Sequence, residues 1–183
     1  MNPLDFSLKP FRGGEPLPSI EITGTIRRSA DALSIGYAIV GDLSELAIPA
    51  PVKSPKRKDG LWEETCLEFF LGMKDSGRYW EFNLSPAGHW NVYSFASYRK
   101  GMRVEPAFAS LPFFIRTEPG AFRLSLDVDP ARILPAGKAF EVAVCAVLRT
   151  VAGRTSHWAL AHPGPRPDFH RKEGFLLTLP ARR

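Results

Sequence analysis

The chain has 183 residues, of which 44% are hydrophobic and 23% are charged, a composition typical of a soluble globular protein. This length is enough to bury a core, and no repeat or shift in composition divides it. We therefore predict a single domain over residues 1–183. Proline (17 residues) and glycine (15 residues) are frequent, which favours many turns between short strands over long helices.

The basic excess of the chain is small and partly local. The 24 Lys and Arg residues against 19 Asp and Glu residues give a net charge of +5, and four of the basic residues lie in one predicted loop: Lys53, Lys56, Arg57 and Lys58. No nucleic-acid-binding motif accompanies them. A solvated loop explains this charge, and we predict no nucleic-acid partner.

The sequence also argues against secretion and membrane insertion. The N-terminus lacks the pattern of a secretory signal, and no stretch approaches the roughly 18 apolar residues that span a bilayer. Cys66 and Cys145 are too few for a disulfide framework and fall in apolar runs, where a free cysteine packs as a small hydrophobe. We expect a reduced, cytoplasmic protein with no membrane partner.

Alternation of apolar and polar residues predicts strands along most of the chain. Residues 19–28 and 32–40 alternate clearly and are predicted to form a hairpin, whereas residues 41–60 lose the alternation, contain three prolines and are predicted to be a long loop. Asp129 and Pro130 are typical of the start of a single helical turn. Further strands are predicted at 65–71, 78–85, 90–96, 113–117, 122–128, 140–150, 157–160 and 175–179.

These strands predict an all-β fold, an antiparallel β-sandwich of two sheets with long connecting loops and little helix. In the segment Leu61–Arg99, the period of two assigns one apolar face to each of two strands, and these faces should join the core. One consists of Leu67, Phe69 and Leu71, and the other of Trp80, Phe82 and Leu84.

The opposite faces of the same two strands carry polar groups. Glu68 lies on the first and Glu81, with Asn83, on the second, so the two carboxylates of neighbouring strands should share one side and repel each other. Water, a shared proton, a ligand or a basic partner must offset this repulsion. Arg99, Arg123 and Arg149 are the candidate basic partners. The alternative is a set of salt bridges on a solvated sheet surface.

The tryptophans divide between core and surface. Trp80 and Trp158 are predicted to pack in the core, whereas Trp62 and Trp90 follow loops or turns and suit either ligand stacking or local packing. Aromatic faces supply flat apolar area, and carboxylates and amides supply directional hydrogen bonds. This mixture is typical of a site for a ligand with many hydroxyl groups.

A late group of residues, His157, His162, Asp168 and His170, offers metal-binding side chains, but its spacing matches no closed metal site. Histidines that hydrogen-bond within a loop explain it as well, so the sequence leaves metal binding here open. No catalytic serine, cysteine or phosphate-loop motif is present. Glu68 and Glu81 could serve as the two acids of a glycosidase, which is an alternative. We nevertheless expect a protein that is not an enzyme.

Two blocks of sequence resemble a known family. The first is W-E-E-T-C-x-E-x-F followed by Y-x-E-F-N-x-S-P-x-x-x-W-x-x-Y-x-F-x-x-Y-R, and the second is HWALAHPGPRPDFH. Together they resemble the DOMON-like superfamily, specifically the bacterial murB-like DOMON group, over about residues 11–179. This superfamily includes family 9 carbohydrate-binding modules and the haem-binding cytochrome domains of some dehydrogenases. The resemblance implies a β-sandwich of two antiparallel sheets that holds a sugar or haem.

In family 9 modules, aromatic side chains sandwich the sugar while acidic and amide groups bind its hydroxyls. The resemblance therefore implies such roles for Trp62, Glu68, Glu81, Asn83 and Trp90. The haem-binding relatives use a Met and a His as axial ligands. Met102 and His170 are the nearest counterparts here, but neither stands in a matching motif, and we predict no cofactor.

The sequence thus predicts a non-catalytic domain that binds a sugar or another small polyhydroxylated molecule. The predicted ligand-binding residues are Trp62, Glu68, Glu81, Asn83, Trp90 and Arg99. Two alternatives stay open. One is a haem- or metal-binding DOMON domain, and the other is a protein-interaction module that presents a sheet edge or the basic 53–58 loop.

Overall fold

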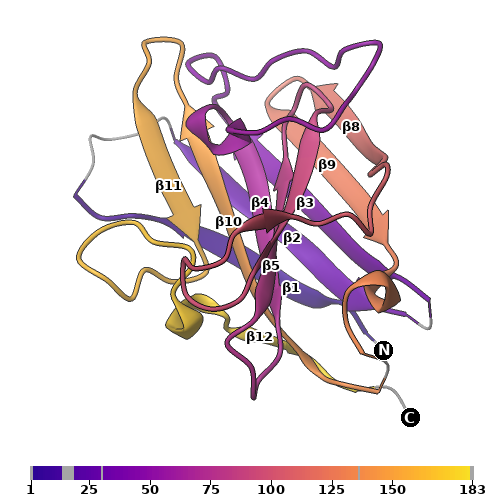
Figure 1. Cartoon of the computed structure of the whole chain (residues 1–183). Helices are drawn as coiled ribbons and strands as arrows, with labels where there is room; N and C mark the ends of the chain where they lie inside the picture. Colours follow the sequence, from indigo (N-terminus) through magenta and orange to yellow (C-terminus); the bar gives the residue numbers. More distant parts are fainter. Residues whose placement is uncertain (1, 14–18, 30, 136, 182–183) are drawn as a thin grey trace.

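The computed structural model describes residues 2–13, 19–29, 31–135 and 137–181. Twelve strands and three single turns of 3-10 helix form this described part of the chain (Figure 1). None of these helical turns is long enough to cross a membrane. The strands are β1 (Leu4–Pro10), β2 (Ile20–Arg28), β3 (Leu33–Gly41), β4 (Cys66–Gly72), β5 (Tyr79–Leu84), β6 (Trp90–Phe95), β7 (Arg103–Val104), β8 (Phe113–Glu118), β9 (Ala121–Val128), β10 (Phe140–Arg149), β11 (Thr155–Ala159) and β12 (Leu177–Leu179); the helical turns are η1 (Leu61–Glu63), η2 (Pro130–Arg132) and η3 (Lys172–Gly174).

The strands pair antiparallel into one curled sheet with the order β7-β6-β5-β4-β10-β11-β1-β2-β3-β9-β8, and β12 pairs separately with β10. β1 joins the two halves of this sheet, because it pairs along its length with β2 and at its end with β11, where Pro10 lies opposite Trp158. The all-β prediction is confirmed. The predicted division into two separate sheets is not confirmed, because β1 links the two halves into one sheet. The sequence pattern did not predict this strand.

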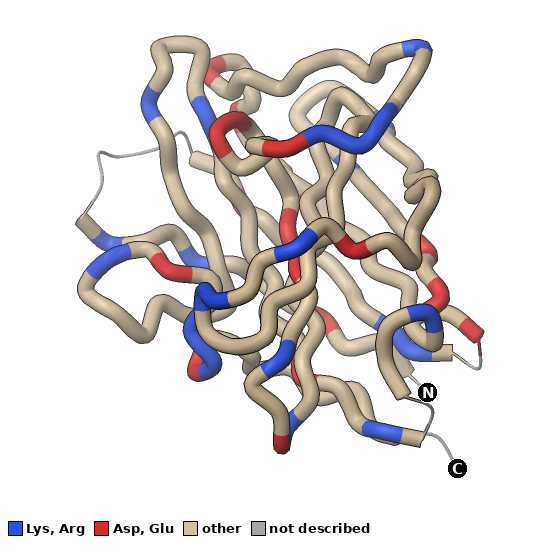
Figure 2. Tube along the Cα trace, in the orientation of Figure 1, with Lys and Arg blue, Asp and Glu red and all other residues tan. Residues whose placement is uncertain are grey.

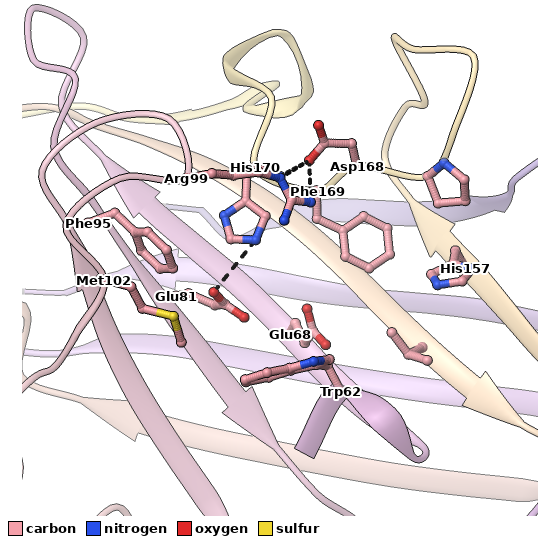
Figure 3. A pocket seen from close by; sticks show the side chains of 12 residues that line it. Trp62, Glu68, Glu81, Phe95, Arg99, Met102, His157, Asp168, Phe169 and His170 are labelled. Carbon is pink, nitrogen blue, oxygen red and sulfur yellow. Dashed lines mark hydrogen bonds and ion pairs between the residues drawn. The ribbon is translucent and has the colours of Figure 1, made fainter. Parts of the chain in front are cut away.

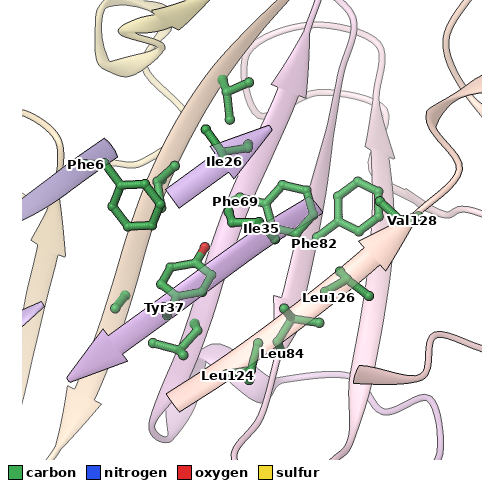
Figure 4. Packing of buried hydrophobic residues seen from close by; sticks show 14 of the residues in the cluster. Phe6, Ile26, Ile35, Tyr37, Phe69, Phe82, Leu84, Leu124, Leu126 and Val128 are labelled. Carbon is green, nitrogen blue, oxygen red and sulfur yellow. The ribbon is translucent and has the colours of Figure 1, made fainter. Parts of the chain in front are cut away.

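The main core fills the space between the two halves of the curled sheet (Figure 4). Phe69 on β4 stacks on Phe82 on β5 with ring centroids 4.4 Å apart. From the other half, the Tyr37 hydroxyl donates to the backbone oxygen of Glu68 at 2.7 Å. The apolar faces predicted for β4 and β5 both lie in this core, which confirms the period-of-two assignment.

A second apolar cluster lies on the other side of β4, β5, β6 and β10. It contains Phe70, Tyr79, Tyr93 and Phe95, and Phe175 and Phe169 from the C-terminal part of the chain pack on it. These two residues belong to residues 160–176, here called the covering segment, which connects β11 to β12. The face that carries the predicted polar residues is therefore buried under this segment, and the alternative of a solvated sheet surface is wrong.

The structure also bears on the predicted helical turn and on the predicted long loop. The helical turn η2 begins as predicted, since the Asp129 side chain accepts a hydrogen bond from the backbone of Ala131 at 2.9 Å. The 41–60 loop lacks regular strands, and its basic run is followed directly by acidic Asp59 (Figure 2). Arg57 in this run is fixed to the fold, because its guanidinium lies 4.3 Å from the Trp90 ring and donates to the Phe108 carbonyl.

Candidate functional site

A cavity of about 320 Å³ lies between the outer face of β4 and β5, the helical turn η1 and the covering segment (Figure 3). The strands supply its floor, η1 supplies Trp62, and the covering segment supplies a wall from Pro167 to His170. The lining residues are Trp62, Glu68, Glu81, Phe95, Arg99, Met102, Val147, His157, Pro167, Asp168, Phe169 and His170.

Two buried carboxyl groups form the floor of this cavity. Glu68 on β4 and Glu81 on β5 are only 2% and 5% exposed, and the register pairs Glu68 with Asn83 and Phe70 with Glu81, so the two glutamates lie diagonally on one face. Glu81 Oε1 accepts a hydrogen bond from Asn83 Nδ2 at 2.9 Å. Glu68 Oε2 is 3.9 Å from the Cys145 thiol, and its Oε1 has no hydrogen-bond partner among the described residues.

Burial decides the protonation of both acids. Burial and, next to it, the charge of Glu81 raise the pKa of Glu68 well above its ordinary value. Burial also raises the pKa of Glu81 to about 7, against the opposing effect of the Asn83 hydrogen bond. These shifts favour the protonated form of Glu68 and leave Glu81 about half ionised at neutral pH. Protonation relieves the predicted repulsion, with a smaller contribution from the nearby charge of Arg99.

His170 closes the cavity from above the carboxyl groups. Its Nδ1 is 2.8 Å from the Tyr79 hydroxyl, which itself accepts the backbone N–H of Arg99 at 3.1 Å. The hydroxyl hydrogen is then free to point to Nδ1, which leaves Nε2 facing Glu81 Oε2 at 3.9 Å. Burial lowers the pKa of His170 to about 4, so the imidazole is neutral at pH 7 and does not form an ion pair with Glu81.

The rim of the cavity is tied together by an ion pair. Arg99 donates from Nη2 and Nε to Asp168 Oδ1 at 2.8 and 3.2 Å, and the Tyr98 hydroxyl donates to Oδ2. Partial burial opposes ionisation of Asp168, but these hydrogen bonds together lower its pKa. Arg99 has a φ of 52°, in the left-handed region. With this backbone conformation, Arg99 makes two contacts. Its N–H donates to the Tyr79 hydroxyl, and its guanidinium binds Asp168 of the covering segment.

The walls of the cavity are largely aromatic. The Trp62 indole is 37% exposed and makes an edge contact with Tyr93 at 5.8 Å between ring centroids. Tyr93 is itself fixed, because its hydroxyl donates to Asp59 at 2.8 Å and accepts from Asn91 at 2.7 Å. Figure 3 shows His170 on one side of the Glu81 carboxyl group and Trp62 on the other. The Trp62 indole is therefore held in place by Tyr93 and offers an aromatic surface beside the carboxyl groups.

The structure brings four of the six predicted ligand residues to this cavity: Trp62, Glu68, Glu81 and Arg99. Asn83 is fully buried behind Glu81 and reaches the site only through its hydrogen bond. Trp90 lies in the main core and does not line the cavity. The other candidate bases are engaged elsewhere, with Arg123 beside Glu118 at 3.5 Å and Arg149 beside Glu64 at 3.0 Å.

Sequence reasoning missed most of the aromatic wall. Tyr93 pairs directly with Glu81 in the sheet, so the period of two places Tyr93 and Phe95 on the carboxyl face and Trp90 on the other. Applying the alternation to residues 90–95 would have identified Phe95 and removed Trp90. Phe169 and Met102 gave no such signal, because they lie in irregular segments that only the tertiary fold brings to the cavity.

The late histidines do not converge. His162 Nε2 contacts the Lys9 backbone oxygen at 2.9 Å, His157 packs beside Phe169, and Asp168 is held by Arg99. Among the residues that the structure describes, no group of three or more His, Cys, Asp or Glu side chains is placed to hold a metal ion. The four residues thus serve separate contacts in and around the covering segment.

Met102 and His170 both line the cavity, which allows a test of the haem alternative. The only His170 nitrogen left for a metal, Nε2, lies 3.9 Å from Glu81 Oε2. An iron atom at a bond length of about 2 Å, with its porphyrin plane, does not fit in that gap. A cavity of about 320 Å³ enclosed by the covering segment is also small for a macrocycle. The residues present do not fit haem.

The solved structures to which this chain is similar include the following three. One is named "putative carbohydrate-binding protein", from Bacteroides uniformis, with 15% identity and a TM-score of 0.63 over 92% of this chain and 83% of that one. A family 9 carbohydrate-binding module from Caldicellulosiruptor kristjanssonii matches at 9% identity in two complexes. With glucose the TM-score is 0.46 over 80% of this chain and 69% of that one; with cellotriose it is 0.49 over 84% and 71%.

No family model and no curated protein matches the sequence. At 15% identity, the likeness to the Bacteroides uniformis protein shows a shared fold. The resemblance to the DOMON-like superfamily therefore stays a prediction from the two sequence motifs.

Proposed function

We propose that this chain is a non-catalytic binding domain for a small polyhydroxylated ligand, a mono- or oligosaccharide or a sugar conjugate. The observation that carries the proposal is the cavity in which a partly exposed indole, Trp62, lies beside two buried carboxyl groups, Glu68 and Glu81. Its volume of about 320 Å³ is at the lower end of the usual range of about 300–1,000 Å³ for small-molecule sites.

The chemistry of the cavity matches a sugar. Trp62 offers a flat apolar surface for one face of a sugar ring. A protonated Glu68 offers a donor and an acceptor, and a half-ionised Glu81 offers acceptors, so together they suit hydroxyl groups, which both donate and accept. The fold that this chain shares with a protein named for carbohydrate binding supports the proposal. Membership of the DOMON-like superfamily and a cytoplasmic location belong to the same proposal.

The proposal is tested by calorimetric titration of the purified protein with a panel of mono- and oligosaccharides at up to millimolar concentration. Replacement of Trp62 by alanine should weaken binding of the sugar that responds by about five- to tenfold, since loss of an aromatic stacking contact is worth about 1 kcal/mol. The matched control is Phe114→Ala. Phe114 is 80% exposed on β8 in the other half of the sheet, and its loss should leave the affinity unchanged.

Two outcomes would contradict the proposal. Hydrolysis of the bound glycoside would make Glu68 and Glu81 a catalytic pair, as in the glycosidase alternative. Failure of every sugar to bind the folded protein would favour a protein-interaction module. A pull-down with the triple variant Lys53→Glu, Lys56→Glu and Lys58→Glu then tests the basic loop, with Arg57 left intact because it holds the loop to the fold.

A further inference from the structure

The floor of the cavity has acidic groups without a cation to match them. Among the described residues, the only ion-pair contact to either floor glutamate is the one between His170 and Glu81 at 3.9 Å, and that imidazole is neutral at pH 7. Arg99, the basic residue at the rim, is engaged by Asp168 at 2.8 Å. Arg99 acts on Glu81 only as a nearby charge, so among the described residues no permanently charged cation forms an ion pair with either floor acid.

A second, independent feature of the floor is an unused hydrogen-bond acceptor. Glu68 lines the cavity, is 2% exposed, and its Oε1 atom is buried without a hydrogen-bond partner among the described residues. A buried carboxyl oxygen without a hydrogen-bond partner destabilises the folded state. Folded proteins rarely keep such a group unless water, an ion or a ligand completes its contacts, or the group has a functional role.

The walls above these acids suit a positive charge. Trp62, Phe95 and Phe169 line the same cavity, and the faces of aromatic rings attract cations. Met102 adds a polarisable side chain. Carboxylates below and aromatic rings at the side form an environment that stabilises an ammonium group more than a neutral hydroxyl.

We propose that the floor made by Glu68 and Glu81 is a subsite for a cationic nitrogen, and that the sugar bound here is an amino sugar with a free ammonium group. This inference rests on the sugar-binding function proposed above. The three N–H donors of the ammonium group match Glu68 Oε1 and the Glu81 carboxylate as acceptors. The positive charge of the ammonium group takes over the role of the proton that burial favours on these carboxyl groups.

Other titratable groups lie around Glu81 and contribute to its surroundings. His170 lies 3.9 Å from Glu81, and Asp168, Arg99 and His157 line the same cavity. The groups that interact with Glu81 through their charge from the strands are Tyr79, Tyr93, Glu68, Cys66 and Cys145. Burial raises the pKa of the tyrosines and cysteines, so these stay neutral at pH 7. Burial lowers the pKa of His157 as well as that of His170.

The test compares matched sugar pairs by calorimetry at pH 7: glucosamine with glucose, galactosamine with galactose, and mannosamine with mannose. The member of one pair with the ammonium group should bind at least about tenfold more tightly than its neutral counterpart. Glu68→Gln and Glu81→Gln should each reduce this preference severalfold. Glu64→Gln should keep it, because Glu64 is exposed beside η1, pairs with Arg149 and does not line the cavity.

The pH dependence of the unmodified protein keeps the inference testable if a variant fails to fold. Between pH 5 and pH 7 a sugar amine stays largely protonated while Glu81, with a pKa of about 7, gains negative charge. Affinity for the amino sugar should rise about tenfold, whereas affinity for the neutral sugar should change little. In Glu81→Gln the rise should shrink.

The possible failures are distinguishable. Equal affinity within every pair, with neutral sugars bound, overturns the ammonium subsite and leaves the sugar-binding function standing. Failure of all sugars, charged and neutral, overturns the proposed function itself. A flat pH profile for the amino sugar overturns the role of the floor carboxylates.

Discussion

At the scale of single residues, Glu81 shows how burial sets chemistry. Its carboxyl group is 5% exposed and has one hydrogen bond, from Asn83, so the energy of desolvation outweighs the stabilisation of the charged form. The resulting pKa of about 7, above the ordinary 4.5, means that the folded protein binds this proton more tightly than the unfolded chain does. The contribution to stability is therefore complete below about pH 4.5 and is lost as the pH rises through 7.

This linkage predicts the behaviour of Glu81→Gln. The amide keeps the shape of the protonated acid, so the variant should be about as stable as the unmodified protein at pH 5. At pH 8 it should be more stable by roughly 2–3 kcal/mol, because it carries no buried negative charge. Urea denaturation at the two pH values measures this difference.

Glu64→Gln is the control for this prediction, because its exposed carboxylate should leave the pH dependence of the unmodified protein in place. His170 contributes in the opposite direction. Its lowered pKa makes the folded state lose stability as the pH falls from 6.5 towards 4 in both proteins. A Glu81→Gln variant that is less stable at both pH values would identify Glu81 as a structural residue.

At the scale of elements, the covering segment makes the cavity out of an otherwise open sheet face. It is fixed at its apex by Asp168, which receives hydrogen bonds from Arg99 and Tyr98, and by the His170–Tyr79 contact. Phe169 and Phe175 pack on the apolar cluster below it. The segment is thus held both by the hydrogen bonds of Asp168 at the rim, here called the polar clasp, and by the burial of two phenylalanine rings.

Asp168→Asn tests the polar clasp. Loss of the charge should lower global stability by about 1 kcal/mol or less, because the Arg99 side chain is 52% exposed and solvent screens the pair. Hydrogen exchange of residues 160–176 should nevertheless accelerate, because the segment opens without unfolding the sheet. Glu118→Gln, which removes the ion pairs on β8, should leave exchange in this segment unchanged. Equal exchange in both variants would show that the charge of Asp168 does not hold the segment.

At the scale of the whole molecule, β1 makes the two halves of the sheet one cooperative structure. It pairs with β2 and β11, and Phe6 in its centre makes an edge contact with Tyr37 at 5.5 Å between ring centroids. Because the two halves share a single core, neither can lose its packing without exposing the other.

Phe6→Ala tests this cooperativity. The cavity left by the ring should destabilise the protein by about 3–5 kcal/mol. All four tryptophans lie in the half that contains β5, β6 and β11, so fluorescence reports that half while far-UV circular dichroism reports both. The two signals should shift together to lower denaturant concentration. A loss of circular dichroism that precedes the change in fluorescence would show that the halves unfold separately.

Local alternation was enough to predict much of the fold and part of the site. The period of two correctly placed Phe69 and Trp80 in the core and put Glu68 and Glu81 on the same opposite face. It did so because side chains in a strand alternate strictly, and neighbouring antiparallel strands keep that alternation in register. Trp62 and Arg99, at the two ends of the same segment, also reach the cavity.

Alternation in the sequence is therefore enough to predict most of the strands, though not β1 and β7, together with the faces of β4 and β5 and the shared face of the two acids. Only the tertiary structure decided that the acid-bearing face is buried, because the Tyr79–His170 hydrogen bond joins residues 91 positions apart and no local pattern encodes such a contact. The link through β1 is equally non-local. Protonation of the carboxyl groups depends on desolvation, and desolvation depends on which distant segment covers them.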